Sequence, residues 1–264
     1  MPLTKNNIVL KTQDLSIGYT AKKSITTIAS NINFELEQGH LIGLVGANGI
    51  GKSTLLRTLI GLQPALSGTI QIHNNSLETT STLDLAKQLS IVLTEPLQSK
   101  NLTVFELVSL GRHPYTNWIG NLTENDLSIV NNALQLVNIT EYKTKKCYEL
   151  SDGQLQKVMI ARALAQDTSL IILDEPTSHL DMYHKAYIIK LLQKLTKETG
   201  KTILFSSHEI DLAIQLCDTM IVMQQDNVVC DQPCQLISNH IFESLFPEDL
   251  ISFDATSGRF IVSK

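Results

Sequence analysis

The stretch 41–54 constrains the fold of this chain most strongly, because an apolar run there breaks into glycines and then opens a helix-forming segment. The spacing Gly46-x-x-x-x-Gly51-Lys52-Ser53 is typical of a loop whose backbone N–H groups surround a triphosphate. Glycines permit that close backbone approach, and the helix N-terminus adds partial positive charge. The stretch therefore predicts a strand, a phosphate-binding loop and a helix, with Lys52 on the β and γ oxygens and the Ser53 hydroxyl on Mg²⁺.

Composition limits the fold class and the partners. With 264 residues, of which 43% are hydrophobic, the chain can form one large α/β domain or two small ones. The net charge of −5 argues against a nucleic-acid partner, since such surfaces are usually basic. No stretch approaches the ~18 consecutive apolar residues of a membrane-spanning helix, and residues 1–7 lack the layout of a secretory signal. We therefore expect the chain to stay on the cytoplasmic side.

The first part of the chain is rich in predicted strands. Apolar and polar residues alternate over 15–19 and 28–36, which predicts two strands with one buried face each. Tyr19 ends the first of them, near the phosphate loop. Its ring either stacks on a purine base or packs as an ordinary core or edge tyrosine.

Polar side chains follow three apolar runs that are typical of buried strands. They are Glu95 after 91–93, Asp174 and Glu175 after 169–173, and His208 after 203–205. Sites in α/β proteins form where strands end, and two acids at the end of a buried strand are costly unless they meet a cation. Asp174 fits a Mg²⁺ partner of Ser53, and Glu175 fits a group that orients or deprotonates water attacking a γ-phosphate.

Residues 104–165 have mostly helical periodicity. Within this block, the loop 111–118 holds Tyr115 and Trp118, the only tryptophan of the chain. Such an aromatic loop indicates a docking surface, or else Trp118 caps a small local core. Further on, Ser151 and Gln154 have the spacing of a capping box, which on its own indicates a helix start. The tail predicts strands at 220–223 and 228–229, a helix near 241–246 and a final hairpin ending at 259–262.

Taken in order, these motifs resemble those of the ATP-binding subunit of an ATP-binding-cassette (ABC) transporter. The likeness runs from about Tyr19 to Val229 and includes the segments 150–154 and 178–181. It implies an α/β fold: a P-loop NTPase (RecA-like) core with an antiparallel β subdomain and an inserted α-helical subdomain. The single domain 1–264 would divide into a core at 1–94 and 167–236, a helical subdomain at 95–166 and a C-terminal extension at 237–264.

The resemblance also implies the roles of the site residues. Two copies would pair head to tail, so that ATP held by Lys52 of one copy is closed by Ser151, Gly153 and Gln154 of the other. Glu175, His208 and Lys52 would be catalytic, and Ser53, Asp174 and Glu95 would hold Mg²⁺. The residues expected to contact ATP within one copy are Tyr19, Gly46, Ala47, Asn48, Gly49, Ile50, Gly51, Lys52, Ser53 and Thr54.

Two positions depart from the family pattern. The family usually has Gly-Gly where this chain has Asp152 and Gly153, and we expect Asp152 to face away from the phosphate as a helix cap. The family usually has glutamine where Glu95 aligns, and Gln98 is a rival for that role. A carboxylate at position 95 would be repelled by the neighbouring acids, so Glu95 is expected to stay retracted until Mg²⁺ arrives.

The segment 102–115 resembles, more narrowly, the ATPases of importers for ferric siderophores, haem and cobalamin. This likeness implies an ATPase at the cytoplasmic face of the membrane that drives import through separate permease subunits, with an extracytoplasmic binding protein acting indirectly. One alternative is a soluble ABC ATPase acting on ribosomes or DNA, which usually carries two cassettes. Another is a nucleotide-binding regulator without turnover, which the presence of Glu175, His208 and Lys52 argues against. Which of the three substrates is imported stays open.

Overall fold

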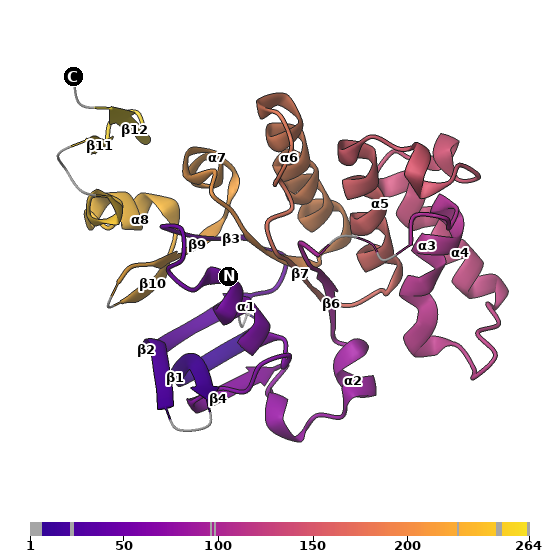
Figure 1. Ribbon diagram of the computed structural model, residues 1–264, viewed down its shortest axis with the longest axis horizontal. Coiled ribbons are helices and arrows are strands. Elements are labelled where there is room, and N and C mark those ends of the chain that lie inside the picture. Colours follow the sequence, from indigo (N-terminus) through magenta and orange to yellow (C-terminus); the bar gives the residue numbers. More distant parts are fainter. Residues whose placement is uncertain are drawn as a thin grey trace, which may run out of the picture.

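The computed structural model describes residues 7–21, 24–95, 97, 99–225, 227–246 and 250–262. Figure 1 shows three parts: a larger sheet with helices across the middle, a small sheet below it, and a group of helices at the right. Gln98, the rival of Glu95, lies outside the described residues. Among the helices that the structure describes, none combines the length and the hydrophobicity of a membrane-spanning helix.

The small sheet is antiparallel and has the strand order β2-β1-β4-β5. Its strands are β1 (Ile8–Ala21), β2 (Ser24–Glu37), β4 (Ser67–Ile72) and β5 (Asn75–Ser76). The buried face predicted by alternation is confirmed at Leu15, Ile17 and Ile32, which are fully buried. Both long strands extend beyond the predicted ranges, because backbone pairing also holds residues such as 24–27, whose exposed side chains give no alternation of burial.

The larger sheet has the strand order β10-β9-β3-β8-β7-β6, and every pair is parallel except the one formed by the edge strand β10. Its strands are β3 (Leu41–Gly46), β6 (Leu89–Val92), β7 (Leu170–Leu173), β8 (Thr202–Ser206), β9 (Thr219–Met223) and β10 (Val228–Asp231). The parallel strands β3, β6, β7 and β8 therefore end at the same edge of the sheet.

Helices cover both faces of this sheet. They are α1 (Lys52–Leu59), α2 (Thr82–Ala86), α6 (Met182–Thr199) and α7 (Ile210–Leu216), with the 3₁₀ turn η1 (Leu77–Thr79). Leu41 and Val45 of β3 pack on the face with α6 and α7, whereas Ile42 and Leu44 face α1 and the small sheet. Because both faces are buried, the central strands are continuous apolar runs in the sequence.

The helical block at 104–165 consists of three helices separated by 3₁₀ turns. They are α3 (Val104–Ser109), η2 (Leu110–Tyr115), α4 (Glu124–Leu136), η3 (Thr140–Tyr142), η4 (Cys147–Glu149) and α5 (Asp152–Ala165). Thr103, Thr123 and Ser151 cap the three helices through complete capping boxes.

Much of the predicted aromatic loop is the 3₁₀ turn η2. Trp118 is 94% exposed, so the interpretation that it caps a local core is wrong.

A buried ion pair fixes η2 against α4 and α5. Arg112 donates from Nε to Asp126 Oδ1 at 2.8 Å and from Nη1 to Ala165 O at 2.9 Å, and both charged side chains are buried. Hydrogen bonds from the Thr123 hydroxyl and amide, and then from Arg112, lower the pKa of Asp126 to about 2. The Arg112 guanidinium also lies 4.1 Å from the centre of the Tyr115 ring.

Asp126→Asn is expected to lower the free energy of unfolding by about 3 kcal/mol at pH 7, because Arg112 keeps its charge in a buried place. The depressed pKa of Asp126 means that the native carboxylate contributes stability above about pH 4 and loses it as the pH falls toward 2. Urea denaturation should therefore separate the variant from wild type at pH 7 and much less at pH 2.5. Glu124→Gln, at an exposed position of α4, should shift stability by less than about 0.5 kcal/mol. Equal stability of wild type and Asp126→Asn at pH 7 would contradict this prediction.

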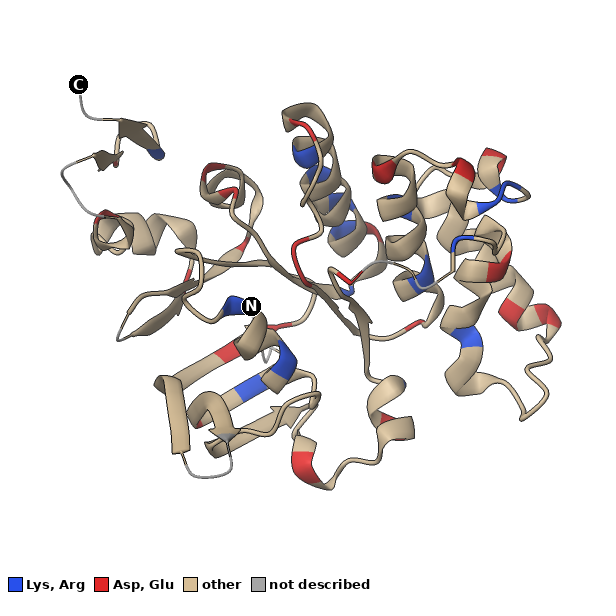
Figure 2. Cartoon of the chain, in the orientation of Figure 1, with Lys and Arg blue, Asp and Glu red and all other residues tan. Residues whose placement is uncertain are grey.

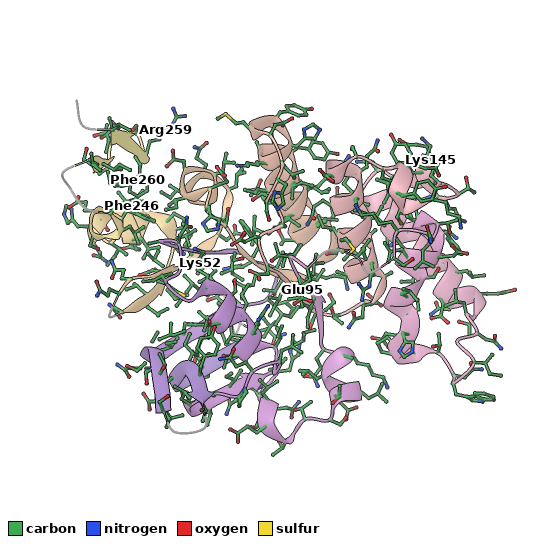
Figure 3. All side chains as sticks on the ribbon, viewed as in Figure 1. Lys52, Glu95, Lys145, Phe246, Arg259 and Phe260 are labelled. Atoms are coloured by element: carbon green, nitrogen blue, oxygen red, sulfur yellow. The ribbon has the colours of Figure 1, made fainter. Side chains whose placement is uncertain are left out.

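The C-terminal part consists of α8 (Pro233–Ser238), the 3₁₀ turn η5 (Glu243–Leu245) and a hairpin of β11 (Ile251–Asp254) and β12 (Arg259–Val262). The predicted hairpin is confirmed, but in place of the helix predicted near 241–246 the structure has only the short 3₁₀ turn η5, and the α-helix α8 lies before it. Pro233 starts the helix earlier, and His240, at φ 58°, interrupts it before residue 241. Phe246 and Phe260 pack edge to face, with their ring centres 5.1 Å apart (Figure 3). This contact joins the hairpin to the segment that follows η5.

Candidate active site

The phosphate loop connects the end of β3 to the start of α1, as the sequence predicts. Glycine is required at two of its positions. A Cβ on Gly46, at φ 153°, would lie 2.6 Å from Met223 O, and a Cβ on Gly51, at φ 113°, would collide with the Ile28 side chain. The loop backbone therefore packs closely against β9 and β2, which leaves no room for a side chain at these two positions.

Lys52 is buried at the start of α1 (Figure 3), with 5% of its surface exposed. Its Nζ donates to Gly46 O at 2.9 Å and to Ala47 O at 3.1 Å. Burial lowers the pKa of Lys52, while the charges of Glu175 and Asp174 oppose that shift. A buried ammonium whose nearest hydrogen-bond partners are two neutral carbonyls is well suited to receive an anionic oxygen.

Asp174 follows β7 and is held by hydroxyl groups from three other elements. Ser206 Oγ donates to Oδ1 at 2.7 Å, Thr94 Oγ1 donates to Oδ2 at 3.2 Å, and Ser53 Oγ donates to Oδ1 at 3.4 Å. The fold brings Ser53 and Asp174 together as expected. Nothing in the sequence alone selected Ser206 or Thr94, although a hydroxyl at the end of a strand beside the acidic one was a usable signal.

Glu175 and His208 form a pair across the ends of β7 and β8. His208 Nε2 lies 2.8 Å from Glu175 Oε1, and both side chains are partly exposed. Glu175 has φ 48°, a left-handed backbone conformation that costs a non-glycine residue about 1–2 kcal/mol. The contact with His208 places the Glu175 carboxylate beside a histidine, where it can accept a proton from water.

Lys52, Ser53, Glu175 and His208 meet at one cavity of about 310 Å³ beside the phosphate loop. The residues that line it are Tyr19, Ile28, Gly49, Gly51, Lys52, Ser53, Thr54, Glu175 and His208. Tyr19 shares a hydrogen bond of 2.7 Å with Thr54 Oγ1 and is 52% exposed, so it is not a core residue. Its ring borders the cavity from the small sheet.

The oxygen atoms around Ser53 fit Mg²⁺. No cluster of three or more acidic, histidine or cysteine groups that could hold a metal occurs among the described residues. Magnesium in nucleotide sites typically takes one or two protein oxygens and completes its shell with phosphate oxygens and water. Ser53 and Asp174 supply that small donor set, with a hydroxyl and a carboxylate whose oxygens are 3.4 Å apart.

Glu95 lies on the side of the site toward the helical block (Figure 3) and pairs with a basic residue of α1. Its Oε1 is 3.5 Å from Arg57 Nη2, and its side chain is 72% exposed. Glu95 also lines a second cavity, of about 340 Å³, together with Asp152, Asp174 and Glu175. An exposed ion pair is worth about 0–1 kcal/mol, so a stronger cation can draw Glu95 away from Arg57.

Glu95→Gln is expected to remain active with a weaker dependence on Mg²⁺, because a neutral oxygen replaces a charged one. On the roles that the family resemblance implies, Glu95→Ala should hydrolyse ATP about 10–100-fold more slowly, since it removes the oxygen altogether. The measurement is the ATPase rate against Mg²⁺ concentration for wild type and both variants, with Gln98→Ala in parallel. If Gln98→Ala alone fails while both Glu95 variants behave as wild type, the alignment of Glu95 with the family glutamine is wrong.

The start of α5 presents a second group of predicted residues. Ser151 Oγ accepts from Gln154 N at 3.3 Å, and Gln154 Oε1 accepts from Ser151 N at 3.0 Å, so Ser151 is the cap. The expectation that Asp152 caps the helix is wrong, because Asp152 is its first helical residue. Gly153 packs against His184, whose ring would be 3.2 Å from an added Cβ. Ser151 is exposed and Gly153 half-buried, so a second molecule can reach this helix start.

Comparison with known proteins agrees with this geometry. The sequence model of the ABC transporter family matches residues 29–178. A petrobactin import ATP-binding protein, FpuD of Bacillus anthracis, is 34% identical over 90% of this chain and 86% of its own. An iron(3+)-hydroxamate import ATP-binding protein, FhuC of Bacillus subtilis, is 37% identical over 83% of this chain and 80% of its own.

Solved structures agree as well. CbiO1 of Clostridium perfringens, part of the cbiONQ transporter complex, aligns with a TM-score of 0.78 at 30% identity, over 89% of this chain and 92% of its own. A dimeric post-hydrolysis state of the cassette MJ0796, bound to ADP and Pi, aligns with a TM-score of 0.72 at 26% identity, over 85% and 98%. The chain therefore belongs to the ABC transporter family. It is an ABC ATPase, of the kind that provides the ATP-binding subunit of importers.

Proposed function

We propose that this chain hydrolyses ATP, with Mg²⁺, to drive import of an iron-siderophore, haem or cobalamin through separate permease subunits. The observation that carries the proposal is the meeting of Lys52, Ser53, Glu175 and His208 at one cavity beside the phosphate loop. The relatives FpuD and FhuC, which are named for import of petrobactin and ferric hydroxamate, support the iron-chelate part of this range.

The residues divide the chemistry among them. Lys52 and the amides of residues 46–54 would bind the phosphates, and the dipole of α1 adds to their attraction. Ser53 and Asp174 would hold Mg²⁺, which on binding neutralises charge on the β and γ oxygens. Glu175 would accept the proton of the attacking water, and His208 would fix the orientation of the Glu175 carboxylate.

We further propose that two copies pair head to tail. Ser151, Gly153 and Gln154 of one copy would close the ATP held by Lys52 of the other. The exposed start of α5, a helix of 14 residues, supports this arrangement because a helix N-terminus attracts anions. The dimeric state of the MJ0796 cassette is consistent with it. The proposed division of the domain is a core at 1–94 and 167–236, a helical subdomain at 95–166 and an extension at 237–264.

In the cell, this pair would lie at the cytoplasmic face of the membrane as a peripheral part of the transporter. It would contact permease subunits directly, and the extracytoplasmic binding protein would act through them. Figure 2 shows both signs of charge in the core, the small sheet and the helical part, which suits contact with proteins better than with a polynucleotide.

The proposal is tested by uptake in cells that lack the gene. We expect accumulation of ⁵⁵Fe-siderophore, haem or ⁵⁷Co-cobalamin to fall to the background level for one of the three and to recover with the wild-type gene. The neighbouring open reading frames should encode a membrane permease and a binding protein. Normal uptake of all three compounds in the deletion strain would contradict the import function.

Trp118→Ala, together with Tyr115→Ala, is expected to weaken assembly with the permease by about 30-fold or more and to leave basal ATPase activity close to wild type. Aromatic residues that become buried dominate such interfaces, and each contributes about 2 kcal/mol or more of binding free energy. The Trp118 side chain is 94% exposed, so a partner can contact it. Co-purification of the complex measures the effect. Because Tyr115 packs on Arg112, Trp118→Ala alone controls for stability, and Leu83→Ala controls for loss of an exposed apolar side chain. Unchanged assembly in both Trp118 variants would contradict a docking role.

A further inference from the structure

Ser206, the last residue of β8, touches both acids of the proposed site with one hydroxyl group. Its Oγ donates to Asp174 Oδ1 at 2.7 Å and accepts the backbone N–H of Glu175 at 2.8 Å. Ser206 is fully buried, so water does not compete for either bond. Ser206 therefore contacts both acids at the end of β7, although the proposed mechanism gives Ser206 no role.

The first contact fixes the direction of the Asp174 carboxylate. Asp174 follows β7, and the neighbouring strands of β7 are β8 and β6. Ser206 at the end of β8 holds Oδ1, while Thr94, just after β6, holds Oδ2 at 3.2 Å. The carboxylate is thus held from both sides, and Ser53 is within reach of the oxygen that Ser206 orients.

The second contact fixes the backbone of Glu175. This residue has φ 48°, which is unfavourable for any side chain with a Cβ, so the turn needs support from its surroundings. Ser206 binds its N–H, and His208, two residues further along the chain, lies 2.8 Å from its carboxylate. The segment 206–208 therefore contacts Glu175 at its backbone N–H and at its side-chain carboxylate.

We propose that Ser206 is a positioning residue for ATP hydrolysis, which sets the Asp174 carboxylate toward Ser53 and the Glu175 carboxylate toward the attacking water. This inference rests on the proposed roles of Asp174 and Glu175. Without the hydroxyl, Asp174 would rotate toward Thr94 and the Glu175 N–H would lose its acceptor. Both acids would then spend less time in the geometry that the reaction needs.

The test compares Ser206→Ala with Ser206→Thr, which keeps the hydroxyl on a strand that tolerates β-branched residues. Ser90→Ala is a matched control, since Ser90 is also fully buried, on β6, and its hydroxyl has no hydrogen-bond partner among the described residues. Each full-length variant is assayed for ATPase rate against ATP concentration, for unfolding in urea, and by calorimetry for ATP binding with and without Mg²⁺.

Ser206→Ala is expected to lower kcat about 10–100-fold, to change the KM for ATP by less than about threefold, and to reduce the extent to which Mg²⁺ tightens ATP binding. Ser206→Thr should recover most of both properties, and Ser90→Ala should match wild type. The inference is overturned if Ser206→Ala keeps wild-type kcat and Mg²⁺-dependent binding, or if its activity falls only in proportion to the folded fraction. Glu175→Gln in the same assays shows whether only the inference on Ser206 fails or the proposed function as well. If Glu175→Gln also retains turnover, the proposed role of Glu175 is wrong.

Discussion

Replacing Lys52 with methionine is expected to weaken ATP binding about 10²–10³-fold and to abolish hydrolysis at ordinary ATP concentrations. Lys52 is buried beneath the phosphate loop and donates to Gly46 O and Ala47 O, so its ammonium is already aimed at the loop interior. Removing a buried, hydrogen-bonded charge costs about 2–5 kcal/mol of binding free energy, a range that includes this loss of affinity. Calorimetric titration with ATP and Mg²⁺ measures it directly.

Methionine keeps the length and the apolar stem of the side chain, so the fold should survive. Lys190→Met, at an exposed position of α6, serves as the control and should bind ATP as wild type does. If Lys52→Met binds ATP normally, the nucleotide lies elsewhere and the cavity beside Tyr19 is not its site.

Glu175→Gln is expected to bind ATP normally but to lose turnover by a factor of about 10²–10⁴, the usual contribution of a general base. An amide in place of the carboxylate can still reach His208 but cannot take a proton from water. Phosphate release from ATP with Mg²⁺ measures the loss. Hydrolysis near the wild-type rate would refute the assignment, whereas an equal loss in the control Glu78→Gln, a residue of η1, would point to a general defect.

Much of the site was predictable because its residue types are imposed by geometry and charge. Gly46 and Gly51 leave no room for a Cβ. Two acids directly after a buried strand are costly unless they meet a cation, so the sequence already indicated a cation site beside Asp174 and Glu175. The parallel sheet then brings the ends of β3, β7 and β8 to one edge, which the apolar runs before Asp174 and His208 already implied.

Other features depended on contacts between residues far apart in the sequence. The ion pair of Glu95 with Arg57 and the bond of Ser206 to Asp174 join elements whose neighbours are known only once the strand order is known. The misplaced C-terminal helix has a local cause: the residue type of His240 does not by itself predict its positive φ. Asp152 was misjudged because Ser151 competes for the cap position and wins.

Two copies are expected to pair around ATP, and light scattering of Glu175→Gln with and without ATP tests this pairing most directly. The chain has a mass of 29.3 kDa, and we predict that ATP shifts the slow variant from this mass to twice this value. Ser151→Arg in the same background should prevent the shift, because it places a large side chain where the partner's phosphate would lie. A Glu175→Gln chain that binds ATP yet stays at 29.3 kDa at all concentrations would contradict the head-to-tail site.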